Sequence, residues 1–132
     1  MINSILYAQE EVKDTNKEKQ EYIASYEKQQ KLLNTSIEQD FKEKIKIALE
    51  LEKINPEMAI QRYWEIIYLY PEQFKEINNQ EKILTSLLNL YKIYKNTEEF
   101  FALLEYLKEM ELLNPQIEEK IKQHYQADLT KM

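Results

Sequence analysis

The sequence predicts an all-α protein, and three observations support this. The 132-residue chain contains no glycine, so the tight primed turns of most β-hairpins cannot be built in the usual way. Apolar residues recur at spacings of three and four, which is the period of an amphipathic helix, and no stretch shows strand-like alternation. The prolines Pro56, Pro71 and Pro115 lie at the ends of these periodic segments, where helices start or stop.

Residues 1–34 are predicted to form a polar, partly flexible N-terminal helix. The few apolar residues toward its end have heptad-like spacing at Ile23, Tyr26, Leu33 and Ile37. Gln30 interrupts this spacing, and a coiled coil needs three or four heptads, so we favour a helix that packs on the rest of the protein. The segment Thr35–Glu38 fits a capping box, which predicts that a new helix begins there and that residues 35–132 form the main domain.

The main domain is predicted to consist of paired helices. Asn55 and Asn114 each precede a proline and are expected to be N-caps, and Thr97 is expected to cap another helix. Asparagine tolerates the left-handed conformation, so we expect it to replace glycine at the junctions. The predicted helices span 36–54, 56–70, 80–95, 98–113 and 115–129.

Two helix pairs, 36–54 with 56–70 and 80–95 with 98–113, repeat at an offset of about 40 residues, which is typical of helical repeat arrays. In the first pair a small, an aromatic, an apolar and a proline residue have the spacing of the tetratricopeptide (TPR) repeat: Ala59, Tyr63, Ile66 and Pro71. Residues 36–115 therefore resemble that family. In the second pair Phe100 replaces the small residue, and the proline is displaced to Pro115. The resemblance implies antiparallel hairpins stacked as a short solenoid of about five or six helices, with 115–129 as the capping helix.

The helix at 56–70 has apolar residues around most of its circumference, which predicts that it is buried on several sides. Its aromatic residues Trp64, Tyr68 and Tyr70 have two interpretations. They pack beneath the N-terminal helix, or they form an exposed interface for self-association, because aromatic residues dominate interface energetics.

The family resemblance also implies a concave groove lined by the first helix of each pair, which in this family binds peptides or helices. The groove residues it implies here are Lys42, Ile45, Leu49, Glu52, Lys82, Thr85, Asn89 and Lys92. Asn89, between Lys82 and Lys92, suits a carboxylate or a peptide amide. The alternative is an ordinary solvated helix face.

The composition argues against catalytic and metal chemistry. Cysteine is absent and His124 is the single histidine, so neither a metal ligand set nor an activated nucleophile is expected, and no cofactor is expected. The net charge of −6 disfavours nucleic acid and anionic membrane surfaces as partners. No apolar run approaches the roughly 20 residues of a membrane-spanning helix.

These observations predict a non-enzymatic protein–protein interaction module, a scaffold that binds a peptide or helix of another protein, within a bacterial assembly. The alternative is a structural protein that forms a homodimer through the aromatic helix face. The sequence slightly favours a cytoplasmic location, but Ala8 before Gln9-Glu10 resembles the end of a signal peptide. Removal of an upstream signal segment would make the protein periplasmic.

Overall fold

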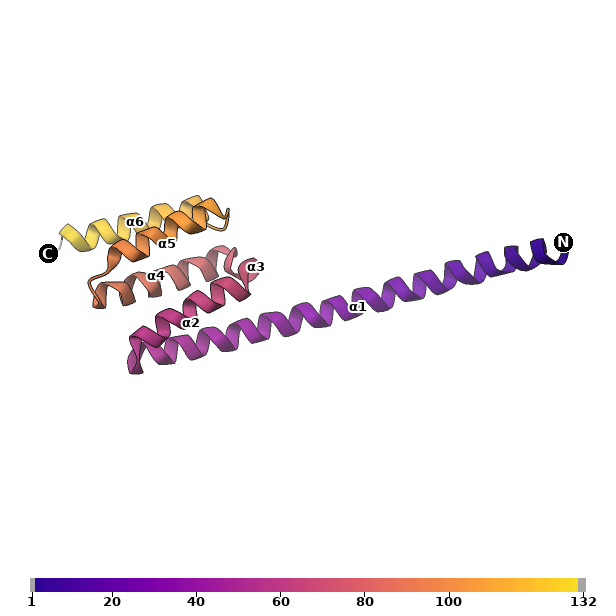
Figure 1. Ribbon diagram of the computed structural model, residues 1–132, viewed down its shortest axis with the longest axis horizontal. Helices are drawn as coiled ribbons and strands as arrows, with labels where there is room; N and C mark the ends of the chain where they lie inside the picture. Colours follow the sequence, from indigo (N-terminus) through magenta and orange to yellow (C-terminus); the bar gives the residue numbers. More distant parts are fainter. Residues whose placement is uncertain (1, 131–132) are drawn as a thin grey trace. The chain divides into compact units, whose positions relative to one another are not determined.

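A computed structural model describes the backbone of residues 2–130 and the side chains of residues 16–130. Over this range the chain forms helices and no strand, which confirms the predicted all-α class (Figure 1). The helices are α1 (Ile2–Ile54), α2 (Pro56–Leu69), α3 (Pro71–Phe74), α4 (Ile77–Ile93), α5 (Thr97–Glu109) and α6 (Pro115–Thr130).

The chain divides into two compact units, Met1–Gln39 and Asp40–Met132. The first unit is the N-terminal part of α1. The second unit, as we call Asp40–Met132 from here on, contains the end of α1 and all the other helices.

The capping box predicted at Thr35–Glu38 is wrong, because α1 continues through this segment without a break. The Thr35 hydroxyl donates a hydrogen bond to the Lys31 carbonyl, one turn earlier, over 2.9 Å. A threonine inside a helix can satisfy its hydroxyl in this way. No proline or glycine precedes Pro56, so nothing in the sequence forces the helix to stop before that point.

The predicted asparagine–proline helix starts are confirmed. The Asn55 side chain accepts a hydrogen bond from the Met58 amide at 3.2 Å, and the Asn114 side chain accepts one from the Gln116 amide at 2.8 Å. The cap predicted at Thr97 is wrong by one residue: Thr97 is already helical, and Asn96 is the N-cap of α5.

Asparagine does not take the left-handed positions that glycine would usually occupy. Those positions are Lys95, with φ of 55°, and Glu111, with φ of 59°. Each follows the C-cap of a helix and completes a Schellman motif. After α4 the Asn96 amide donates to the Tyr91 carbonyl at 3.0 Å, and after α5 the Leu112 amide donates to the Leu107 carbonyl at 2.9 Å.

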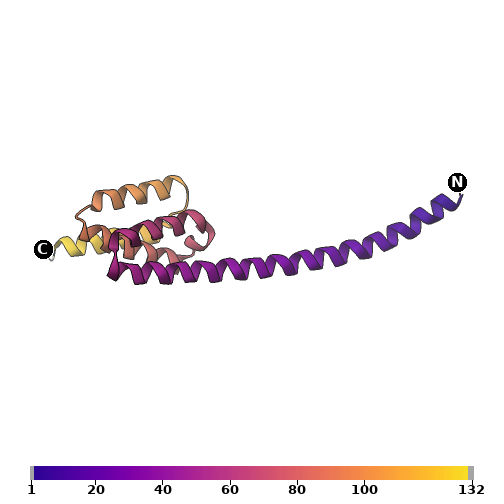
Figure 2. The ribbon, with the colours of Figure 1, turned by 60° about the horizontal axis from the view of Figure 1, so that its bottom comes forward.

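Helix α4 is the centre of the second unit, because it packs against α2, α3, α5 and α6. Its buried residues include three fully enclosed leucines, Leu84, Leu87 and Leu88. Figure 2 shows α5 (orange) alongside the other helices of the unit, joined to α4 and α6 by the loops at its two ends. Burying each such leucine contributes about 1.5–3 kcal/mol, so α4 supplies a large share of the stability of the unit.

Helix α2 is less buried than its apolar circumference predicts. Ala59 and Tyr63 are enclosed as expected, but Met58, Tyr68 and Leu69 are exposed. The prediction of burial around the helix is therefore wrong for these three residues. The pattern of α2 alone could not reveal which of its faces would be covered, because the neighbours of a helix are decided by tertiary packing.

Gln80 is the buried polar residue that connects the helix junctions of the second unit. Its side-chain amide donates to the carbonyl of Phe74 at 3.2 Å and to that of Leu112 at 2.8 Å. Its side-chain oxygen accepts from the Asn114 amide at 2.7 Å. Gln80 thereby holds the α5–α6 loop against the start of α4, and it satisfies one buried and two partly buried main-chain groups.

Replacing the left-handed residues by glycine is expected to stabilise the protein. In Lys95→Gly or Glu111→Gly the Cβ clash of the left-handed conformation disappears. We expect a gain of about 0.5–1 kcal/mol in the free energy of unfolding, measured by urea denaturation. The matched control is Glu105→Gly at an exposed interior position of α5, which should cost about 1 kcal/mol. A loss of stability in both junction variants would contradict the assignment.

Gln80→Leu is expected to lower the free energy of unfolding by about 2–3 kcal/mol, because the substitution removes the hydrogen-bond partner of one buried and two partly buried main-chain groups. Gln116→Leu is the control, since Gln116 is exposed, and its effect should stay within about 0.5 kcal/mol. Equal stability of the two variants in urea denaturation would show that Gln80 does not hold the junctions together.

Candidate functional site

The end of α1 and the first half of α4 enclose a groove of about 410 Å³ within the second unit. We call it the α1–α4 groove. It is lined by Phe41, Lys42, Ile45, Lys46, Leu49, Asn79, Lys82 and Ile83.

The α1–α4 groove combines an apolar floor with a basic rim. Phe41 and Ile83 are buried, whereas Lys42, Lys46 and Lys82 are exposed. Among the residues that the structure describes, none of these lysines has an acidic partner within ion-pair distance. In a protein with a net charge of −6, the three lysines place positive charge beside apolar surface.

Half of the groove residues that the family resemblance implies line the α1–α4 groove. They are Lys42, Ile45, Leu49 and Lys82. The half-buried Thr85 and the exposed Asn89 lie further along α4 and do not line it. Glu52 and Lys92 instead interact with Ser86 and Asp128, as described below.

Sequence reasoning missed four lining residues, Phe41, Lys46, Asn79 and Ile83. Phe41 and Ile83 fit the core pattern, so the sequence could not show that one edge of each remains accessible. Asn79 precedes the predicted helix 80–95, but it lies inside α4, where its side chain donates to the Gln73 carbonyl at 2.9 Å.

Glu52 belongs to a polar cluster with Tyr63 and Ser86 in the second unit. Burial raises the pKa of Glu52 above its usual 4.5, and a hydrogen bond from Ser86 partly opposes this. The Tyr63 hydroxyl is buried without a hydrogen bond of normal geometry to any described residue. Burial raises the pKa of Tyr63 to about 12; the Ser86 hydroxyl lowers it and the negative charge of Glu52 raises it.

The aromatic residues Trp64, Tyr68 and Tyr70 do not form one exposed face, so the interface suggested for them needs correction. Tyr68 is 83% exposed, whereas Tyr70 is buried. The Tyr70 hydroxyl donates to the Asp40 carboxylate, and its ring meets that of Phe41 edge-on with centroids 5.8 Å apart. Trp64 is half-buried, and its indole N–H donates to the Tyr91 hydroxyl at 2.7 Å.

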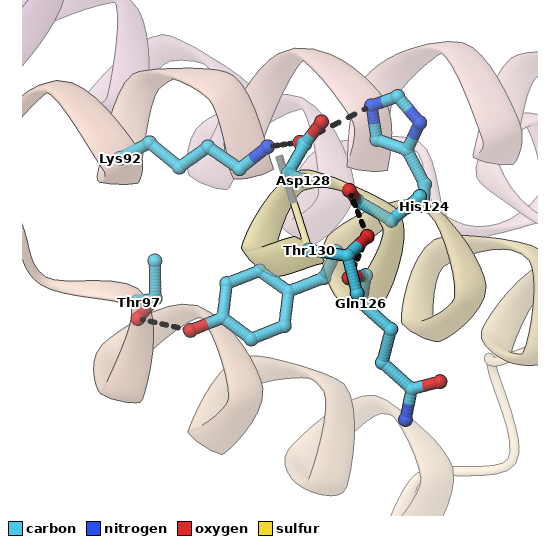
Figure 3. A network of polar contacts seen from close by, with 8 residues as sticks. Lys92, Thr97, His124, Gln126, Asp128 and Thr130 are labelled. Carbon is cyan, nitrogen blue, oxygen red and sulfur yellow. Dashed lines mark hydrogen bonds and ion pairs between the residues drawn. The ribbon is translucent and has the colours of Figure 1, made fainter. Parts of the chain in front are cut away.

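Lys92 turns toward α6 instead of the α1–α4 groove. Figure 3 shows its ion pair with Asp128, which His124 approaches with its Nε2 3.8 Å from the carboxylate oxygen. Beside them the hydroxyls of Thr97 and Tyr125 are 3.4 Å apart. These contacts join the C-terminal half of α6 to α4 and α5, and we assign them a structural role.

Over the described residues no group of three or more histidine, cysteine, aspartate or glutamate side chains is arranged to hold a metal ion. Within the same range no helix combines the length and apolarity needed to cross a membrane. Comparison with protein-family models, with curated proteins and with solved structures gives no match for this chain. The candidate sites therefore have to be interpreted from their own chemistry.

Stability is expected to fall at alkaline pH because of the tyrosines. The pKa of Tyr63 and that of Tyr70 are each raised from 10.0 to about 12, Tyr70 through its hydrogen bond to Asp40. As pH rises from 10 to 12, these groups ionise first in the unfolded chain. The contribution of the two raised pKa values to the free energy of unfolding is therefore complete below pH 10 and is lost as pH rises toward 12.

We expect Tyr63 to account for about 2 kcal/mol of that loss. The measurement compares urea denaturation of the wild type and Tyr63→Phe at pH 9, 10, 11 and 12, where lysine titration is common to both proteins. As pH rises across this range, the wild type should lose more stability than Tyr63→Phe. A constant difference would contradict the raised pKa of Tyr63.

Proposed function

We propose that this protein is a non-enzymatic interaction module that binds an acidic, amphipathic segment of another protein in the α1–α4 groove. The observation that supports this best is the set of exposed lysines, Lys42, Lys46 and Lys82, beside an apolar floor. A partner helix or peptide with carboxylates flanking apolar side chains would complement both features.

The charge of the groove also argues for a protein partner over other classes. Three lysines are enough to orient a short acidic segment, but the protein as a whole is acidic and would repel a long polyanion such as nucleic acid. The volume of about 410 Å³ suits a few side chains of a docked segment.

We further propose that the second unit is a TPR-like solenoid, in which the end of α1 and α4 are the first helices of successive pairs. The positions of Ala59 and Tyr63 support this interpretation, because both are enclosed, as the small and aromatic positions of such a repeat require. The α1–α4 groove would then correspond to the concave surface implied by the family resemblance.

The proposal predicts that Lys82→Glu weakens binding of an acidic peptide. The probe is a fluorescein-labelled helical peptide with glutamates flanking a leucine stripe, followed by fluorescence anisotropy. We expect at least about a tenfold loss of affinity, because an attractive charge becomes repulsive. Binding of the wild type should also weaken as salt is raised from about 0.05 to 0.5 M.

The matched control is Lys28→Glu, which makes the same change of net charge at an exposed position of the first unit. It should change the affinity by less than about twofold. A second probe replaces the glutamates of the peptide by lysines and should not bind. Equal losses in Lys82→Glu and Lys28→Glu would show that net charge, and not the groove, governs binding.

Self-association is the second candidate function, and it is favoured by exposed apolar side chains in the first unit. Ile23, Tyr26 and Leu33 are each more than half exposed and follow a helical spacing on α1. A homodimer in which these side chains of two α1 helices pack together would remove them from water. Sedimentation equilibrium of the wild type and of Ile23→Glu would detect it, since the variant should shift a dimer toward monomer.

A further inference from the structure

A second hollow, of about 570 Å³, lies in the second unit between α2, the end of α4 and the start of α5. We call it the aromatic hollow. It is lined by Glu57, Ile60, Gln61, Trp64, Tyr91, Tyr94 and Glu99. It shares no lining residue with the α1–α4 groove, and its size is within the range of about 300–1,000 Å³ that is usual for ligand pockets.

Trp64, Tyr91 and Tyr94 give this hollow three aromatic rings. The indole N–H of Trp64 is already bound to the Tyr91 hydroxyl at 2.7 Å. This bond orients both side chains and leaves Trp64 to offer its ring surface, not a donor, to a ligand. Aromatic faces attract cations within about 6 Å of the ring centroid.

The charge of the aromatic hollow is complementary to a cation. Glu57 and Glu99 are among its lining residues, and none of the lining residues is basic. The Glu99 carboxylate is held by a 2.6 Å hydrogen bond from the Asn96 side chain. Burial raises the pKa of Tyr91, the hydrogen bond from Trp64 lowers it, and the negative charge of Glu99 raises it, so the charge of this carboxylate acts on the Tyr91 hydroxyl.

The polar atoms of the aromatic hollow also distinguish among cations. Glu57, Glu99 and Gln61 provide side-chain oxygens that accept hydrogen bonds. A quaternary ammonium has no hydrogen to donate to them. A guanidinium has five N–H donors in one plane, stacks on aromatic faces, and pairs with carboxylates, so it matches both the rings and the acceptors.

We propose that the aromatic hollow binds an arginine side chain of a partner protein, with the guanidinium stacked on Trp64 and bonded to Glu99. This site is independent of the α1–α4 groove. The two sites differ in charge. The lysines of the α1–α4 groove suit acidic side chains, and the glutamates of the aromatic hollow suit a basic side chain.

Trp64 is the only tryptophan of the chain, so its fluorescence reports directly on this site. The experiment titrates the full-length protein with N-acetyl-arginine amide at constant ionic strength and monitors tryptophan emission. The comparison probe is N-acetyl-citrulline amide, which has nearly the same shape without the charge. We expect a saturable change with the arginine probe and at least about tenfold weaker binding of citrulline. The lysine analogue should bind more weakly than arginine, because an ammonium does not stack.

Glu99→Gln is the diagnostic variant, and Glu98→Gln is its control. Both residues are exposed in the first turn of α5, so both substitutions remove the same favourable interaction with the helix N-terminus. Only Glu99 lines the aromatic hollow. We expect Glu99→Gln to weaken arginine binding by at least about fivefold and Glu98→Gln by less than about twofold.

The result that would overturn the proposal is equal binding of arginine and citrulline, or no saturable change in emission, or equal effects of the two glutamine variants. Lys82→Glu separates this site from the proposed function. It should leave arginine binding intact while it weakens binding of the acidic peptide by at least about tenfold, so either site can fail without the other.

Discussion

The second unit depends on the burial of α4 (Ile77–Ile93). This helix contacts α2, α3, α5 and α6, and its leucines 84, 87 and 88 are fully enclosed. Because a central helix has few faces left for water, each neighbour has to cover a different side of it. The Gln80 side chain then fixes the start of α4 to the loop before α6 through hydrogen bonds to Leu112 and Asn114. The apolar contacts of α4 supply most of the stability of the unit. The hydrogen bonds of the Gln80 side chain fix the position of the α5–α6 loop.

Both candidate sites use the ends of this central helix. Lys82 and Ile83, near its start, line the α1–α4 groove, and Tyr91 and Tyr94, near its end, line the aromatic hollow. A rigid, buried element thus positions side chains for two surfaces of opposite charge. If both proposals hold, one partner that engages both surfaces would bind with a higher effective affinity than either contact gives alone.

Because the chain contains no glycine, two helix ends have strained backbone conformations. Lys95 and Glu111 take left-handed backbone angles that glycine would adopt without strain. Each makes it possible to complete a Schellman motif, so the strain is offset by hydrogen bonds to carbonyls that would otherwise lack partners. Asparagine instead serves at helix starts, where Asn55 and Asn114 cap the following helices.

The sequence by itself determined the class of the fold and the helix starts at Pro56 and Pro115, whereas the predicted helices 80–95 and 98–113 extend beyond the observed ends at Ile93 and Glu109. Periodicity and the Asn55-Pro56 and Asn114-Pro115 pairs act locally, through main-chain hydrogen bonds that do not depend on distant residues. The Thr35 capping box failed because a threonine can bond either to a helix start or back to the preceding turn, and the local sequence allows both.

Tertiary structure decided the sites, because exposure depends on which helices meet. Four of the eight predicted groove residues line the α1–α4 groove, since they lie on the face of α1 or α4 that borders it. Lys92 shares the helix but pairs with Asp128 of α6, a partner 36 residues away in sequence. The aromatic residues of α2 have different surroundings for the same reason: Phe41 and Asp40 contact Tyr70, Tyr91 binds Trp64, and Tyr68 remains 83% exposed. No spacing rule within one helix could have shown this, because the coverage comes from other helices.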